Sequence, residues 1–243
     1  RNRIMRIIGL SCLLLFVTAP CLAAELQPFA LDYQASYGSM NATASRSLSG
    51  PDANGQWELQ SQVEVKLLGT TVTGIEERSR FAWHDDLPVS VDYRYVQKGI
   101  GHRERGVSFD SGGQHAQWTQ NDNKGELTLP TATYDSLNSV LVLRHQLQGG
   151  GTEFIVPVAD KSEISSQRYQ TLGNEQLKTP AGTFATVHLR RVRDGDSKRT
   201  TDLWLAPALD HALVKLMQVE PDGNTILLVL KHGKVGAASY PAP

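Results

Sequence analysis

Cysteine is nearly absent from this chain of 243 residues. The two cysteines, Cys12 and Cys21, both lie within the first 23 residues, which we expect to be removed from the protein. The remaining chain would then contain no thiol. This excludes disulfide bonds, a cysteine nucleophile and a metal site with cysteine ligands, so the fold must be stabilised by its core alone.

Long hydrophobic segments are also absent. The longest apolar run covers residues 7–17, whereas a membrane-spanning helix needs about 20 apolar residues. Arg1, Arg3 and Arg6 precede the run, and small residues follow it up to Ala24. This pattern is typical of a secretory signal peptide over residues 1–23, with cleavage after Ala23 or Ala24. We therefore predict a secreted protein that does not span the membrane.

The chain has no excess of positive charge. Without residues 1–23 it has 21 basic residues against 25 acidic residues, a formal charge of −4. Proteins that bind nucleic acid present a concentrated basic surface to the phosphates. The charge balance therefore argues against nucleic acid as a partner.

Motifs for metal binding and catalysis are missing as well. The seven histidines form no His-x-His or His-Glu-x-x-His pair, and no serine lies in a Gly-x-Ser-x-Gly motif. The glycine clusters lack the lysine of a phosphate-binding loop. We predict no metal, no cofactor and no catalytic residue. A hydrolase of envelope polymers remains an alternative. Acid and base are adjacent at His84-Asp85 and at Asp210-His211, but both pairs are typical of turns, and catalytic triads are assembled in space rather than in sequence.

Apolar and polar residues alternate with a period of two through most of the chain. Short turns separate these runs, as at Thr179-Pro180-Ala181-Gly182, where proline and glycine favour a β-turn. The last run, residues 225–232, is apolar on both faces, which indicates a central or covered strand. We predict a mainly β fold with one domain over residues 24–232. It would be an antiparallel up-and-down β-barrel or wrapped sheet, followed by a flexible tail at residues 233–243.

One segment, residues 135–148, has the periodicity of a helix. Its apolar stripe includes Leu137, Val140 and Leu141, and three glycines follow it. Asp135 or Ser136 is the predicted N-cap. A helix on a β meander must bury its stripe, so we expect it to dock at the mouth or face of the sheet as a plug or lid.

Aromatic residues on several predicted strands are the candidate ligand-binding site. Side chains two apart on a strand share a face, and the turn at residues 85–88 makes two aromatic-bearing strands neighbours. The rings could line an apolar cavity, or they could form a packed core without a ligand. The predicted ligand-binding residues are Phe81, Trp83, Tyr93, Tyr95, Trp118 and Trp204.

Several motifs resemble those of a known family. The segments TYDSLNSVLVLRHQL, LKTPAGTFATVHLRR, DLWLAP and KLMQVEPDGN occur in this order. They are similar to the domain of unknown function 3108 (DUF3108) family of periplasmic proteins, over roughly residues 31–232. The resemblance implies a secreted β protein of Gram-negative bacteria without an assigned reaction. The layout is more distantly similar to the half-barrel lipoprotein carriers of the periplasm.

These observations favour a periplasmic, non-enzymatic protein that binds a lipid or another amphiphilic component of the cell envelope in a β-barrel cavity. Two alternatives remain. The first is a protein–protein interaction module of the envelope, which would pair with a partner through an open sheet edge. The second is the envelope hydrolase described above.

Overall fold

The computed structural model describes residues 26–130 and 132–241. The predicted signal peptide at residues 1–23 and its cleavage site lie outside the described residues. No helix in the described ranges has the length and hydrophobicity needed to cross a bilayer.

The fold is mainly β, as predicted. The first half contains β1 (Phe29–Tyr37), β2 (Met40–Ser49), β3 (Gln56–Leu67), β4 (Thr70–His84), β5 (Leu87–Gly99), β6 (Arg103–Phe109), β7 (His115–Gln120) and β8 (Asn123–Thr128). The second half contains β9 (Tyr134–Asp135), helix α1 (Ser139–Gln148), β10 (Glu153–Asp160), β11 (Glu163–Thr179), β12 (Gly182–Val192), β13 (Thr200–Ala206), the 3-10 helix η1 (Pro207–Leu209), β14 (Ala212–Val219), β15 (Thr225–Val235) and β16 (Ala238–Tyr240).

All strands belong to one sheet, which wraps around but does not close. From edge to edge the order is β8 to β1, then β15 to β9, so that the first strand pairs with a strand near the C-terminus. Pairing is antiparallel throughout except between β9 and β10. The last long strand, β15, lies between β1 and β14, which confirms its predicted central position. Of the two predicted forms, barrel or wrapped sheet, the open wrapped sheet is the one observed.

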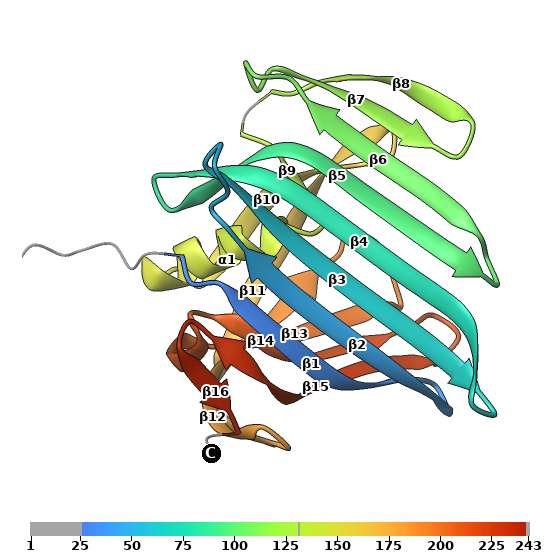
Figure 1. Ribbon diagram of the computed structural model, residues 1–243, viewed down its shortest axis with the longest axis vertical. Coiled ribbons are helices and arrows are strands. Elements are labelled where there is room, and N and C mark those ends of the chain that lie inside the picture. Colours follow the sequence, from blue (N-terminus) through green and yellow to red (C-terminus); the bar gives the residue numbers. More distant parts are fainter. Residues whose placement is uncertain (1–25, 131, 242–243) are drawn as a thin grey trace, which may run out of the picture.

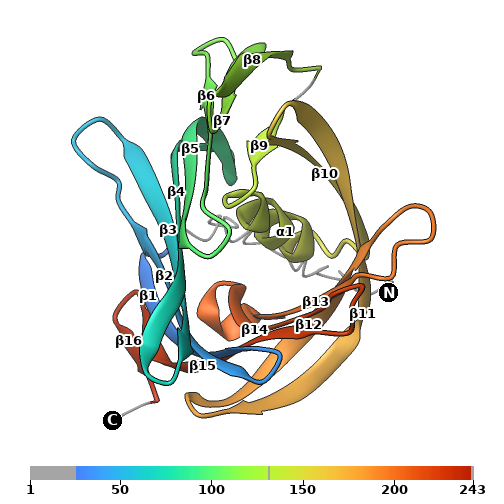
Figure 2. The same ribbon diagram turned by 90° about the vertical axis from the view of Figure 1, so that its right-hand side faces the viewer.

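Helix α1 lies inside the curve of this sheet, as Figure 2 shows. On one side Leu141 of the helix, with Leu137 from the preceding turn, packs against a cluster that includes Phe81 and Tyr93. Another side packs with Val142 and Leu143 against a cluster from β10 to β14. The helix therefore contacts both halves of the sheet and fills the space between them.

The predicted start of the helix was wrong by several residues. Residues 134–135 form β9, and the first helical residue is Ser139, with Asn138 as N-cap. The Asp135 carboxylate accepts hydrogen bonds from the backbone N–H groups of Leu137 and Asn138, at 2.9 and 2.8 Å. These bonds stabilise a turn in front of the helix, so Asp135 caps the turn rather than α1.

The predicted flexible tail was wrong over most of its length. Strand β15 continues to Val235, and β16 then pairs back onto it. Val235 is buried, and the Tyr240 ring packs edge-on against Phe184 with a centroid distance of 5.7 Å. These two apolar side chains anchor the segment to the fold.

The two ends of the wrapped sheet differ. In Figure 1 the helix and the β2–β3 loop lie at one end, and the β3–β4 and β5–β6 hairpins end at the other. The β1–β2 and β14–β15 turns also lie at this second end, because the Gly38 N–H donates to the Thr225 carbonyl at 2.9 Å. We call the second end the mouth, since α1 lies at the first end (Figure 1).

Candidate functional site: a cavity inside the wrapped sheet

A cavity of about 610 Å³ lies on the concave side of the sheet. Its walls come from β2, β3 and β4 on one side, from β10 to β15 on the other, and from the start of α1. The sheet alternation explains this, because every second residue of each strand faces inward. One cavity therefore joins both halves of the sheet and the helix.

The apolar part of the wall comes mainly from the second half of the sheet and from the helix. Aliphatic side chains line it, and most of them belong to the buried core clusters or pack against them. They are Val63, Leu137, Val140, Leu143, Leu203, Leu213, Leu216, Ile226 and Leu228. Such a surface can hold a hydrocarbon chain.

Two charged residues, Arg46 on β2 and Glu77 on β4, face this apolar wall. Burial raises the pKa of Glu77 above its usual value, while the Tyr93 hydroxyl, which donates to it at 2.7 Å, and the nearby Arg46 act in the opposite direction. The Nε atom of Arg46 is buried and has no hydrogen-bond partner among the described residues. Arg46 lines the cavity, so its guanidinium group is a donor for an anionic or polar ligand group.

An ion pair lies beside the cavity and includes its lining residue Asp160. Arg105 on β6 donates to Asp160 at the end of β10 at 3.1 Å, with only 13% of the Arg105 side chain exposed. Its guanidinium also lies over the Tyr95 ring, 4.3 Å from the centroid. This pair links the two halves of the sheet across the gap where their edge strands do not pair.

Three arginines gather at the mouth, where β12 ends and β13 begins. Burial and the neighbouring Arg191 and Arg199 lower the pKa of Arg193. Arg193 donates to the Thr201 hydroxyl at 2.9 Å, and Arg199 pairs with Glu220. All three arginines line the cavity, so its open end is basic.

Buried polar contacts fix the helix at the other end. Ser79 on β4 donates to the Asp135 carboxylate at 2.6 Å, and the Asn138 amide donates to Ser90 on β5 at 2.9 Å. Burial raises the pKa of Asp135 to about 7. Arg144, in the middle of α1, donates to Asp210 at 2.7 Å, and only 2% of its side chain is exposed.

The acid–base doublets of the sequence do not form a catalytic arrangement in the described residues. Asp210 is bound by Arg144 and by the Gln27 N–H rather than by the adjacent histidine. Asp85, Asp210 and His211 all have positive φ angles, which is typical of turn residues. Within residues 26–130 and 132–241, no group of three or more His, Asp, Glu or Cys side chains could hold a metal ion.

The structure places five of the six predicted aromatic residues together. Phe81, Trp83, Tyr93, Tyr95 and Trp118 belong to one hydrophobic cluster, which α1 covers. Phe81 is fully buried and Tyr93 is 3% exposed, and the Phe81 and Trp83 rings meet edge-on at 6.2 Å. None of the five lines the cavity wall. They pack in the cluster that contains the wall residue Leu137. Their contact with a ligand stays a prediction.

Trp204 lies elsewhere. Its ring stacks on His188 at 4.2 Å, and Lys215 lies over it, also at 4.2 Å. The alternate residues of β13, Thr201 and Leu203, line the cavity, so Trp204 points to the opposite face of the strand. Trp204 therefore lies apart from the other five residues, and its contact with a ligand stays a prediction.

The comparisons with known proteins place this chain in a family. A model of the family described as "Protein of unknown function (DUF3108)" matches residues 32–230. The chain belongs to the DUF3108 family. A comparison with curated proteins finds no match.

Two solved structures resemble this DUF3108 chain. A β-barrel-like protein of domain of unknown function DUF1849 from Brucella abortus is 10% identical, with a TM-score of 0.57, over 86% of this chain and 98% of that one. A "putative lipoprotein" from Parabacteroides distasonis is 14% identical, with a TM-score of 0.36, over 86% and 95% of the two chains. The first likeness shows that the open, barrel-like fold occurs outside DUF3108.

Sequence reasoning missed the charged residues of the cavity. A signal was present for Arg46, because it occupies the inward position of β2 between the buried residues Ala44 and Leu48. Glu77 likewise precedes the buried Ser79 and Phe81 on the inward face of β4. A charged residue in the apolar register of a strand marks an inward-facing polar site.

Proposed function

We propose that this DUF3108 chain is a periplasmic, non-enzymatic protein that binds an amphiphilic component of the cell envelope in the concave cavity. The observation that carries the proposal is the cavity itself, which combines an aliphatic wall with the buried, unpartnered Nε of Arg46. The signal-peptide pattern at the N-terminus supports the location.

The size and lining of the cavity fit such a ligand. Its volume of about 610 Å³ lies within the range of small-molecule sites in proteins. The hydrocarbon part of an amphiphile would contact the leucines of β13 to β15 and of α1. Its polar part would accept hydrogen bonds from Arg46, whose charge is opposed in part by Glu77.

Mass spectrometry of the intact, native protein tests whether an amphiphile co-purifies. Binding in solution is measured with a fluorescent fatty acid, and Arg46→Met should weaken it about 10- to 100-fold, because a hydrogen bond to a charged group contributes roughly 1.5–3 kcal/mol. Arg46→Lys, which keeps the charge, should lose less affinity.

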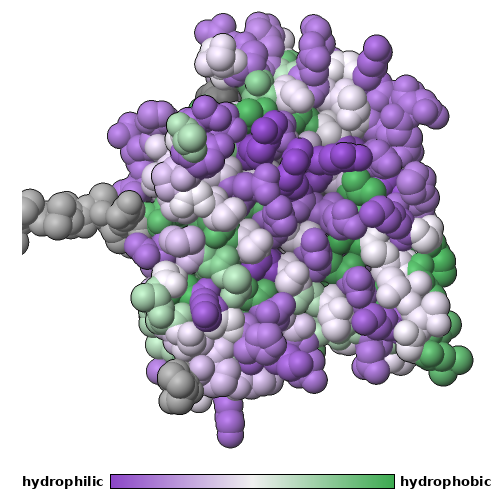
Figure 3. All heavy atoms as spheres, viewed as in Figure 1, coloured by the Kyte–Doolittle hydropathy of each residue, from purple (hydrophilic) through white to green (hydrophobic). Residues whose placement is uncertain are grey.

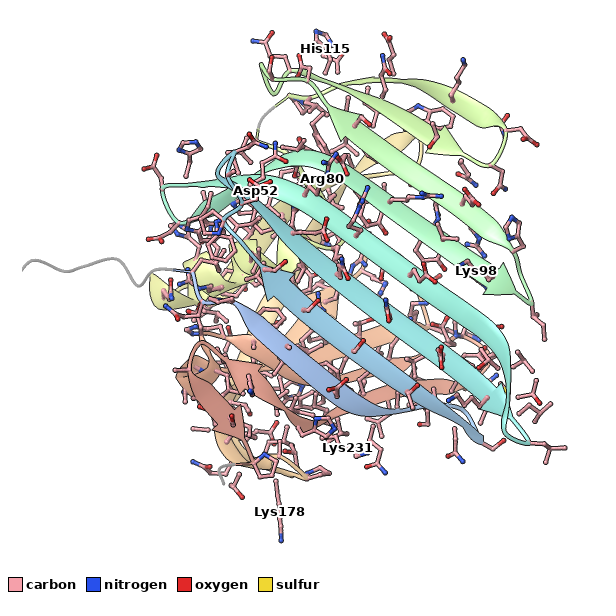
Figure 4. The ribbon with its side chains drawn as sticks, viewed as in Figure 1. Asp52, Arg80, Lys98, His115, Lys178 and Lys231 are labelled. Atoms are coloured by element: carbon pink, nitrogen blue, oxygen red, sulfur yellow. The ribbon has the colours of Figure 1, made fainter. Side chains whose placement is uncertain are left out.

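The matched control is Arg80→Met. Arg80 lies on the outward face of β4, where Figure 4 shows it, and pairs with Asp92. Its loss should leave fatty-acid binding unchanged. A folded Arg46→Met protein that binds as tightly as the wild type would overturn the polar half of the proposal. A wild-type protein that neither carries nor binds any amphiphile would overturn all of it.

An interaction module that recruits a partner to the open sheet edge is less well supported. The edge strand β8 has six residues and carries Lys124 and Glu126, with Gly125 between them. Short strands with charged side chains are typical of edges that resist pairing with another chain.

A further inference from the structure

Three large aliphatic side chains are exposed at the mouth. Leu67 and Leu68 end the β3–β4 hairpin, with 52% and 99% of their surface exposed, and Ile100 ends the β5–β6 hairpin, with 72% exposed. We call these residues the apolar rim. Figure 3 shows hydrophobic residues at the edge of the molecule where these hairpins end. Soluble proteins rarely gather such side chains at one place without a partner.

The two hairpin tips are joined to each other. The N–H of Ile100 donates to the Val72 carbonyl at 3.1 Å, and the Thr73 hydroxyl donates to the Ile100 carbonyl at 3.4 Å. Gly99 permits this approach, because a Cβ atom there would lie 2.2 Å from the Val72 carbonyl oxygen. The apolar rim is therefore one surface supported by backbone contacts.

The turn that presents Leu68 is built at a conformational cost. Leu68 and Gly69 have φ angles of +49° and +83°, the region in which hairpin turns prefer asparagine followed by glycine. A bulky aliphatic residue is uncommon there. Leu68 gains almost no burial in return, since 99% of it is exposed. Unfavourable backbone geometry without packing is characteristic of a residue retained for binding.

The rim is continuous with the cavity. On β3 the residues Val63, Val65 and Leu67 lie on one face, because side chains two apart point the same way. Val63 lines the cavity, Val65 packs against the neighbouring core cluster, and Leu67 reaches the rim. An apolar row therefore leads from the cavity wall to the exposed tip.

The charge around the rim is basic at the tips themselves. Residues 65–75 and 97–103 contain Lys66, Lys98, His102 and Arg103 but no acidic residue. Glu64 and Glu76 lie behind the tips and pair with Lys66 and Lys98, at 3.5 and 3.0 Å. Figure 4 shows Lys98 near the end of β5. Aliphatic side chains flanked by basic ones are the combination that binds the surface of an anionic bilayer.

We propose that the apolar rim inserts into the surface of a lipid bilayer that contains anionic phospholipids. This would set the mouth of the cavity against the membrane. An amphiphile could then move along the apolar row between bilayer and cavity, a step that rests on the proposed function. The docking itself does not depend on it.

Flotation of the purified protein with vesicles of phosphatidylethanolamine and phosphatidylglycerol tests the docking. The double variant Leu68→Asn/Ile100→Ser should reduce the vesicle-bound fraction about tenfold or more, because two aliphatic side chains no longer leave water. The matched control, Ile155→Ser, replaces an isoleucine of β10 that is 65% exposed but lies outside the rim. It should float like the wild type.

Two outcomes would overturn the docking: a wild-type protein that does not float, and a double variant that floats as well as the control. If circular dichroism shows the double variant to be unfolded, Leu68→Asn alone decides, because asparagine is favoured at this φ angle.

Uptake of the fluorescent fatty acid from vesicle-free solution separates the two proposals. The folded double variant should retain it. A wild type that floats through the rim but takes up no fatty acid would refute the proposed function and leave the docking intact.

Discussion

At the end of the sheet that holds α1, polar groups are buried and paired, whereas at the mouth apolar groups are exposed. Asp135 is fully buried and bound by Ser79, and Arg144 is bound by Asp210 inside the fold. At the mouth Leu68 is almost completely exposed, and Arg191, Arg193 and Arg199 crowd one another. At one end polar residues hold the helix in place. At the other end the exposed residues contribute little to the stability of the fold.

The contrast assigns different roles to the two ends. A helix tied by buried hydrogen bonds to β4, β5 and the β13–β14 corner is a plug rather than a mobile lid. The open end, where side chains are presented to the outside, is then the entry to the cavity. Substitutions at the helix end should change stability, and substitutions at the apolar rim of the mouth should change vesicle binding.

The largest effect should come from the ion pair that holds the helix. Arg144→Met leaves the Asp210 carboxylate without its guanidinium partner, and this carboxylate is only 15% exposed. Breaking one partner of a buried pair typically costs about 3–5 kcal/mol. Urea denaturation should show a loss of this size in the free energy of unfolding.

Lys98→Met is the control, because the Lys98–Glu76 pair has a similar distance of 3.0 Å but both side chains are more than half exposed. Such surface pairs contribute about 0–1 kcal/mol. Equal losses in the two variants would contradict the view that the helix is locked in place.

A pH dependence should follow from Asp135. Its pKa is raised to about 7 by burial, so the folded protein keeps a proton that the unfolded chain releases above about pH 4. The contribution to stability is therefore present in full below pH 4 and is lost as the pH rises to about 7. Three pKa units correspond to about 4 kcal/mol at most.

Asp135→Asn is nearly isosteric, and its side-chain oxygen can still accept from the N–H groups of Leu137 and Asn138. The unfolding free energy of this variant should lack the pH dependence that Asp135 contributes. The difference in unfolding free energy between wild type and variant should thus change by about 2–4 kcal/mol between pH 4.5 and 7.5. Glu77 raises the pKa of Asp135 further, so Glu77→Gln should reduce the effect. A constant difference would show that Asp135 is ionised in the fold.

The sequence was sufficient for the features that local pattern specifies. The Pro180-containing turn separates β11 from β12, and the alternation of residues 225–232 correctly indicated a central strand. The apolar stripe of residues 137–147 correctly predicted that this segment contains a helix. Each signal is repeated over several residues, so tertiary contacts confirm it rather than override it.

The cavity and the helix anchor could not be predicted in this way. Arg46, Glu77 and Asp160 lie on strands β2, β4 and β10, and only the wrapping of the sheet brings them to one cavity. Asp135 resembles an N-cap because its carboxylate accepts hydrogen bonds from the N–H groups two and three residues later. These bonds stabilise the turn that precedes α1. The aromatic residues were the obvious candidates by type, yet most of them complete a core cluster.

The smallest expected effect on the free energy of unfolding comes from a substitution at the mouth. It tests most directly whether the residues exposed there serve binding rather than stability. Leu68→Asn removes a side chain that is 99% exposed from a position with a φ angle of +49°. Nothing buried is lost, and asparagine tolerates this backbone conformation better than leucine does. The free energy of unfolding should stay within about 0.5 kcal/mol of the wild type or rise slightly. Urea denaturation measures this difference. A clear loss of stability would mean that Leu68 packs in the fold and that the rim is structural. An unchanged or more stable protein with weakened vesicle binding would instead show that leucine at this position serves binding at the expense of the turn.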